Sequence, residues 1–101
     1  MRTIVFFDLP TITSKHKQAY RAFRKYLLKN GFMQLQYSVY SRLSLNQNQC
    51  QSVENLVKKA VPKEGIVQIL SITEKQYSKM QYLIGEEKTQ MINDDRRLII
   101  L

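Results

Sequence analysis

The sequence has little of the chemistry from which many active sites and extracellular domains are built. Its 101 residues include no tryptophan, one cysteine and one histidine. The single cysteine, Cys50, excludes an internal disulfide and a cysteine metal cluster. The single histidine, His16, has no base or nucleophile beside it, and neither a phosphate-binding glycine loop nor a paired-histidine metal motif occurs. Few residues therefore remain as candidates for catalysis.

Long apolar runs are absent as well. No segment approaches the roughly 20 apolar residues that a membrane-spanning helix requires. Asp8 interrupts the first apolar run too early for a signal peptide. Glycine and proline are scarce, at three and two residues, while 44% of the residues are hydrophobic, so we expect one folded, cytoplasmic domain. Because a chain this short buries a modest core, pairing with a second copy would stabilise it.

Acidic residues are almost missing from the first half of the chain. None occurs between Asp8 and Glu54, whereas from Glu54 onward eight basic residues are balanced by seven acidic ones. The basic residues between Asp8 and Glu54 are Lys15, Lys17, Arg21, Arg24, Lys25, Lys29 and Arg42. Net charge alone serves solubility, but a one-sided excess is typical of a protein that binds a polyanion, and it favours nucleic acid.

A carboxylate at the end of an apolar run is the first candidate for a functional residue. Residues 4–7 are β-branched or aromatic, which predicts a strand covered on both faces. Pro10 lacks an N–H and favours extended geometry at Leu9, so the strand ends near Asp8. Such a carboxylate requires a donor, a cation or a metal ion. Asp8 either caps the next loop or pairs with a cation of the first helix, or it has a functional role; both interpretations stay open.

The first helix is predicted from an N-cap at Thr13 or Ser14 to about Asn30, and Gly31 follows as a C′ residue. At about 100° per residue, one stripe of this helix is apolar and packs on the sheet. The basic stripe nearly opposite consists of Lys17, Arg21, Arg24 and Lys25. Because no carboxylate accompanies these cations, a nucleic-acid contact competes with an ordinary solvated face as their explanation.

Residues 32–43 alternate between apolar and polar side chains, which is the period of a strand. The polar side of this alternation carries Gln34, Gln36, Ser38 and Tyr40. The segment is long enough for one bent strand or for a hairpin that turns near residues 36–38. The sequence leaves both possibilities open.

The second half of the chain predicts one helix and one strong strand. The helix begins at Ser44 or Asn46, ends before Pro62 and buries Cys50 as a small core residue. Residues 66–72 form the strand, and the capping box that begins at Thr73 predicts a short helical turn. Residues 80–84, closed by Gly85, are a candidate for a further short strand.

The order of these elements predicts an α+β fold, the ferredoxin-like β-α-β-β-α-β pattern, over residues 1–85. Residues 86–101 are expected to be a polar linker that ends in an apolar strand. Because Leu98–Leu101 cannot bury themselves alone, they are expected to dock on a sheet edge, the chain's own or a partner's.

Four segments together carry a specific combination of residues. They are the run Ile4–Leu9 (IVFFDL), the end of the basic helix at 29–32 (KNGF), residues 35–40 (LQYSVY) and residues 69–77 (ILSITEKQY). This combination, which covers nearly the whole chain, resembles the CRISPR-associated protein two family, the small partner of the CRISPR integrase in spacer acquisition. The Phe-Phe-Asp-Leu-Pro form is similar to that of members found beside single-effector (type II) systems.

The resemblance implies a homodimer whose C-terminal strand docks on the partner's sheet, and which binds duplex DNA and bridges integrase dimers. It also implies a Mg²⁺-dependent (or Mn²⁺-dependent) endonuclease on RNA or DNA, with Asp8 as catalytic and metal-binding residue. The candidate nucleic-acid contacts are Lys15, Lys17, Arg21, Arg24, Lys25, Arg42 and Tyr40.

This chain departs from the family pattern after its first strand. Many members carry further acidic residues there, whereas Pro10–Thr13 follow here. One carboxylate per protomer leaves two hypotheses open: a nuclease whose metal is shared within a dimer, and a non-catalytic DNA-binding scaffold. A virulence-associated, toxin-type endoribonuclease shares the fold and is a third hypothesis. A ferredoxin-like ligand-binding domain is a fourth, and the charge asymmetry speaks against it.

Overall fold

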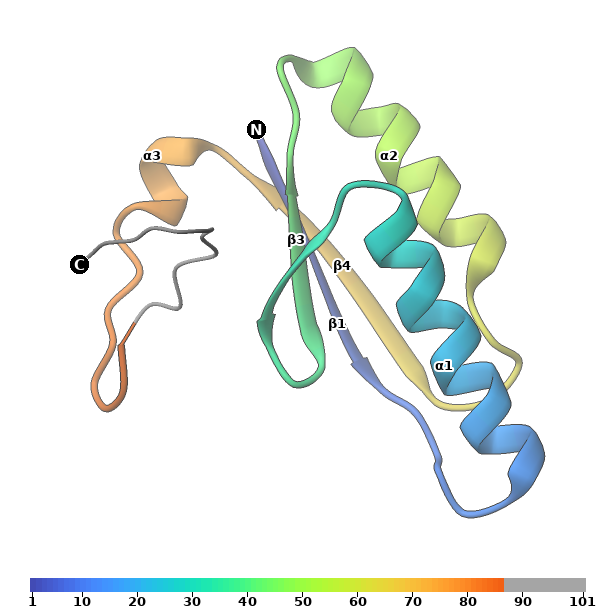
Figure 1. Cartoon of the computed structure of the whole chain (residues 1–101). Helices are drawn as coiled ribbons and strands as arrows, with labels where there is room; N and C mark the ends of the chain where they lie inside the picture. The colour runs from blue at the N-terminus through green and yellow to red at the C-terminus, as the bar shows by residue number, and fades with distance from the viewer. Residues whose placement is uncertain (87–101) are drawn as a thin grey trace, which may run out of the picture.

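The computed structural model describes residues 1–86 of the chain (Figure 1). Its elements, in chain order, are β1 (Arg2–Asp8), α1 (Ser14–Lys29), β2 (Met33–Gln36), β3 (Val39–Leu43), α2 (Gln47–Ala60), β4 (Ile66–Ile72) and the short α3 (Glu74–Tyr77). The predicted linker beyond Glu86 and the predicted docking of Leu98–Leu101 lie outside the described residues.

The four strands form one sheet in the order β2-β3-β1-β4, and every pair of neighbours is antiparallel. Helices α1 and α2 lie together on one face of this sheet (Figure 1). This arrangement is the predicted ferredoxin-like α+β fold, which is thereby confirmed. Among the described residues, no helix is long and apolar enough to cross a bilayer.

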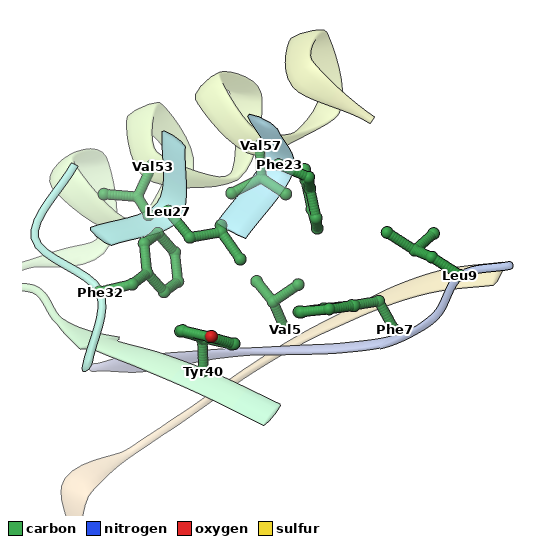
Figure 2. Close-up of a cluster of buried hydrophobic side chains, with 9 residues drawn as sticks. All are labelled: Val5, Phe7, Leu9, Phe23, Leu27, Phe32, Tyr40, Val53 and Val57. Carbon is green, nitrogen blue, oxygen red and sulfur yellow. The ribbon is translucent and has the colours of Figure 1, made fainter. Parts of the chain in front are cut away.

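The core lies between the sheet and the two helices (Figure 2). From β1, Val5 and Phe7 point into it, and the helices contribute Phe23, Leu27, Val53 and Val57. The Phe7 ring meets Phe23 edge-on at 5.2 Å between centroids. Each such buried side chain contributes about 1.5–3 kcal/mol through the surface it removes from water. This core fixes the helices, and with them the cations of α1, relative to the end of β1.

The helix ends follow from local capping, as the sequence predicted. The Thr13 hydroxyl accepts a hydrogen bond from the His16 N–H at 3.1 Å, and the His16 ring completes a capping box. At the other end of α1, Gly31 has φ +85°, the left-handed conformation expected of a C′ glycine. In α2, Asn46 is the N-cap and accepts from the Gln49 N–H at 2.8 Å. Because both its backbone N–H and its ring take part in the N-cap of α1, His16 has a structural role.

Cys50 is buried where α2 meets the sheet, as predicted, with 1% of its surface exposed. Its neighbours are polar: the thiol lies 3.1 Å from the Ser71 hydroxyl and 3.3 Å from the Thr3 hydroxyl. Ser71 in turn donates to the Glu54 carboxylate at 2.5 Å. This small network joins α2 to strands β1 and β4 across the core.

Residues 32–43 form a hairpin and not one bent strand. Strands β2 and β3 are joined at Tyr37 and Ser38, and a register shift between Gln34 and Gln36 marks a bulge. The bulge and the turn reset the alternation, so that the predicted polar side is not continuous. Tyr40 consequently faces the helices and is completely buried, which corrects its expected position on a polar face.

The prediction of a short strand at residues 80–84 is wrong. These residues form no strand, because none of them pairs with a strand of the sheet within the described part of the chain. Met80 and Tyr82 instead line a groove together with Ile4 and Phe6, on the sheet face that the helices leave free. The predicted helical turn after Thr73 is confirmed, since Thr73 and Gln76 form a capping box at the start of α3.

Candidate nucleic-acid interface and carboxylate site

The basic side chains of α1 form the first part of the candidate site. Within residues 1–86 none of them takes part in an ion pair, because the two ion pairs of this region join Arg2 to Glu74 and His16 to Glu64. The exposed, unpaired cations of α1 include Lys15, Lys17, Arg21, Arg24 and Lys25. Four of them, Lys17, Arg21, Arg24 and Lys25, share one stripe of the helix and form a row of positive charge that is free to contact phosphates. Lys15 instead lies near Val61 and Pro62, where it lines a groove at the start of the helix.

Arg42 is placed differently from these five. It lies on β3, is half-buried, and donates to the Asn30 carbonyl oxygen at 2.8 Å. The Asn30 carbonyl belongs to the C-terminal end of α1, where a cation also complements the helix dipole. The structure therefore gives Arg42 a capping role and separates it from the exposed row that the sequence grouped it with.

Asp8 is the last residue of β1, where it pairs in register with Ile66 of β4. Its side chain is exposed, and with Ser38 and Gln68 it lines a shallow groove at this end of the sheet. It makes no hydrogen bond or ion pair with any residue of the described part. Neither expected structural role, capping or pairing with a helix cation, is found there. The carboxylate is free for a ligand.

The donor set for a metal ion is small. No group of three or more His, Cys, Asp or Glu side chains comes together within residues 1–86. Among the described residues, no such group includes Asp8. Mg²⁺ commonly keeps several waters and binds one or two carboxylates together with substrate phosphates. The residues present fit such an ion only where a second carboxylate, for example from a second copy, or a phosphate completes the site.

Tyr40 is not part of the exposed surface. Its ring stacks on Phe7 with centroids 5.5 Å apart, and Figure 2 shows it within the core cluster. Its hydroxyl is buried and has no hydrogen-bond partner in the described structure. A direct contact with nucleic acid through Tyr40 is therefore excluded in this conformation, because Phe7 and the helices cover the ring.

An exposed aromatic residue that sequence reasoning missed lies nearby. Tyr37, at the β2–β3 turn, has 75% of its surface exposed, and its ring stacks on Tyr20 of α1. Burial, followed by the neighbouring Tyr37 hydroxyl, raises the pKa of Tyr20, so the Tyr20 phenol remains neutral near pH 7. The alternation of residues 32–43 had placed Tyr37 on the buried side. The possible turn at residues 36–38 was the sequence signal that could have removed Tyr37 from the alternating strand.

The second face of the sheet, opposite the helices, is largely apolar. Residues paired in register share a face, so Ile4, Phe6 and Asp8 of β1 lie on it with their partners. Its other apolar members include Met33, Val39, Leu43, Ile66, Leu70 and Ile72. Two of them, Ile66 and Leu70, are 58% and 52% exposed. Asp8 therefore lies at the margin of an incompletely covered apolar surface.

Comparison with known proteins matches this chain to a family. The family model described as CRISPR associated protein Cas2 matches residues 1–80. A protein of Treponema denticola named CRISPR-associated endoribonuclease Cas2 is 52% identical over the full length of both chains. A protein of the same name from Streptococcus mutans is 46% identical over all of this chain and 93% of its own.

A solved structure shares the fold. The crystal structure of Streptococcus pyogenes Cas2 at pH 6.5 superposes with a TM-score of 0.61, covering 82% of this chain and 99% of that chain at 17% identity. The strand order, the aspartate that ends β1 and the match over residues 1–80 all agree with the resemblance seen in the sequence. The chain therefore belongs to the Cas2 family of CRISPR-associated proteins.

Proposed function

We propose that this chain acts in CRISPR spacer acquisition as a homodimer that binds duplex nucleic acid and bridges integrase dimers. The observation that carries the proposal is the row of exposed α1 cations, which have no carboxylate partner within residues 1–86. Four such cations on one stripe of the helix suit the regularly spaced phosphates of a duplex. Membership of a CRISPR family favours this role over that of a toxin-type endoribonuclease.

Binding of this kind depends on charge and not on base sequence. Lysine and arginine side chains that neutralise phosphates release condensed counterions, so affinity falls as salt rises. The cations are expected to contact the backbone of the duplex and to leave its base edges unread.

The test is the salt dependence of duplex binding. We expect the four-residue variant Lys17→Gln, Arg21→Gln, Arg24→Gln and Lys25→Gln to lose affinity and to flatten the plot of log K against log salt by up to about one unit per cation removed. A control variant removes four charges elsewhere, through Lys58→Gln, Lys59→Gln, Lys75→Gln and Lys79→Gln. Equal losses in the two variants would show that net charge, and not α1, determines binding.

We propose endonuclease activity as a second function, because Asp8 is an exposed carboxylate without a partner in the described structure. Relatives 52% and 46% identical to this chain bear the name endoribonuclease. A bound Mg²⁺ or Mn²⁺ would polarise a phosphodiester and activate water. The contribution of this chain is to hold the Asp8 carboxylate at the end of a rigid central strand, paired in register on both sides.

A second copy of the chain would supply a second Asp8 carboxylate, since residues 1–86 of one chain bring no group of three or more ligand side chains together. The apolar second face of the sheet, with Asp8 at its margin, is the surface that a second copy would cover in a twofold dimer. In that arrangement the two Asp8 side chains lie on opposite sides of the axis and can share one ion.

The test of the second function is cleavage of labelled duplex DNA and single-stranded RNA over a series of Mg²⁺ and Mn²⁺ concentrations. We expect Asp8→Asn to abolish metal-dependent cleavage while leaving stability within about 0.5 kcal/mol, because the side chain is exposed. The matched control is Glu86→Gln, another exposed carboxylate. Equal cleavage by wild type and Asp8→Asn would show that the activity comes from a contaminant or does not use Asp8. Binding without cleavage by both would identify a scaffold.

A further inference from the structure

Tyr37 presents an aromatic ring to solvent at the turn between β2 and β3. Its exposed fraction is 75%. The ring stacks on Tyr20 with centroids 6.1 Å apart and an interplanar angle of 29°, a contact that favours this orientation. Tyr20 in turn meets Phe7 of the core edge-on, with centroids 5.9 Å apart. An exposed ring is thus supported from below by one stacked and one edge-on aromatic contact that lead into the core.

The turn that carries Tyr37 is tied to the end of β1. The Phe7 N–H donates to the Ser38 carbonyl oxygen at 3.1 Å, and the Gln34 side-chain amide donates to the Tyr37 carbonyl oxygen at 3.3 Å. Ser38 also lines the same groove as Asp8. The exposed ring and the free carboxylate therefore occupy the same end of the sheet, on positions that the backbone holds fixed relative to each other.

Cations flank the supporting ring. Lys17 and Arg24 lie three residues before and four residues after Tyr20 on α1, and both are exposed. Residues at these spacings are neighbours on a helix surface, with Cβ atoms about 5–6 Å apart. Polar groups flank Tyr37 itself, since Gln36 is exposed and Ser38 is half-buried. A site for an unpaired nucleotide combines a supported aromatic face, adjacent cations and side chains that can hydrogen-bond. All three components are present around Tyr37.

We propose that Tyr37 is a stacking site for an unpaired nucleobase of a single-stranded nucleic acid, with its phosphates on Lys17 and Arg24. This inference rests on the proposed nucleic-acid binding and deepens it, because it adds a strand type that the site prefers. Bases in a duplex are already stacked on each other and cannot reach an exposed ring. The platform therefore selects for single strands, frayed ends or loops, whereas the α1 cations alone accept either form.

The test compares binding of four short end-labelled probes by fluorescence anisotropy: oligouridylate, oligothymidylate, an abasic strand of equal length and a duplex. Stacking of one base contributes about 1–3 kcal/mol, so Tyr37→Leu should weaken binding of the two base-containing single strands about fivefold or more. Binding of the abasic strand and of the duplex should change less than about twofold. Tyr37→Phe keeps the ring and should restore wild-type affinity for the single strands.

Two controls separate stacking from trivial effects. Leu45→Ala removes an apolar side chain that is 87% exposed on the β3–α2 connection, at the other end of the hairpin, and should leave all four affinities unchanged. The exposure of Tyr37 means that Tyr37→Leu should unfold at nearly the wild-type temperature. Equal effects of the substitution on oligouridylate and oligothymidylate would identify the base as the ligand. A larger effect on oligouridylate would identify RNA as the source.

The outcomes distinguish this inference from the function on which it rests. Single-strand binding that does not change in Tyr37→Leu would overturn the stacking site. If duplex binding is still sensitive to salt in that case, the α1 interface remains supported. Equal weakening of the duplex and of the single strands would also overturn it, since no base is then being recognised. Absence of binding by the wild-type protein to all four probes would overturn both proposals.

Discussion

Arg2 and Glu74 form a bidentate ion pair that ties the start of β1 to α3. The Arg2 guanidinium donates to both carboxylate oxygens of Glu74, at 2.9 and 2.7 Å. The central carbon of the same guanidinium lies 4.2 Å from the centroid of the Tyr77 ring. The hydrogen bond from Arg2 holds the pKa of Glu74 below its ordinary value. The pair therefore stabilises the folded state above the unfolded pKa of the carboxyl, and this stabilisation is lost as pH falls through the lower folded value.

We expect Glu74→Gln to lower the unfolding temperature at neutral pH and to have a shrinking effect as the solution is acidified below the ordinary pKa of glutamate. Because the Glu74 side chain is 45% exposed, the difference should be small, about 0.5 kcal/mol. Thermal unfolding of both proteins over a pH series provides the measurement, and Glu86→Gln is the control. A difference that grew toward acid pH would contradict the assigned sign.

Among single residues, the sequence located Asp8 correctly at the end of a strand, because Pro10 and the apolar run are local signals. It did not predict that Asp8 would be exposed, since exposure depends on what covers the second face of the sheet. It also interchanged Tyr37 and Tyr40. Both follow one alternating pattern, and only the bulge and turn before Val39 decide which of the two rings is buried.

The connection from α2 to β4 depends on one glycine. Gly65 has φ +103°, and a Cβ atom there would lie 2.8 Å from both the Asp8 carbonyl oxygen and the Leu9 Cδ2 atom. The Asp8 contact is with backbone in a paired strand, which cannot move away cheaply. We expect Gly65→Ala to lower the free energy of unfolding by about 2–3 kcal/mol, measured by urea denaturation, and to reduce any activity that depends on the position of Asp8.

Gly85 provides the matched control. Its φ is +83°, but a Cβ atom there would meet no heavy atom within 4 Å in the described structure. Gly85→Ala should therefore show the backbone cost alone, about 1 kcal/mol or less, since the segment can adjust. Equal costs for the two substitutions would mean that the close approach of Gly65 to Asp8 contributes nothing to stability.

Elements with strong local signals were predicted within a residue or two. Helices α1 and α2 and strand β4 fall into this class, because capping side chains and hydrophobic periodicity are encoded over a few residues. The strand expected at residues 80–84 failed for the opposite reason. An apolar run becomes a strand only where another strand offers its backbone, and here the run lies over the face of the sheet and not along its edge.

At the scale of the whole molecule, the second face of the sheet, which the described residues cover only in part, is the feature that most needs an explanation. It joins exposed apolar side chains of β2, β3 and β4 on one surface, and such surfaces commonly mark interfaces. We expect Leu70→Glu, at a side chain 52% exposed, to shift the protein from dimer to monomer in sedimentation velocity. Placing a carboxylate in that interface should raise the dissociation constant at least about tenfold.

The control for this substitution is Leu45→Glu, which adds the same charge at a residue outside the second face. It should sediment like the wild-type protein. An unchanged dimer in Leu70→Glu would assign dimerisation to another surface, and a monomeric wild-type protein would refute the shared Asp8 site. The sequence alone predicted that a second copy would help, from chain length, but it could not identify the face. That requires the register of four strands.

The placement of Cys50 has a consequence for how opening of the core can be followed. It is the one thiol in the sequence, and it is closed off where α2 meets β1 and β4. A thiol reagent reaches it only when α2 separates from the sheet, so the rate of modification reports the population of molecules in which α2 is separated, when reclosing is faster than modification. The rate can be followed by intact mass at several low denaturant concentrations, with no label engineered into the protein. A rate that depends weakly on denaturant indicates local detachment of α2, and one that rises steeply indicates unfolding of the entire domain.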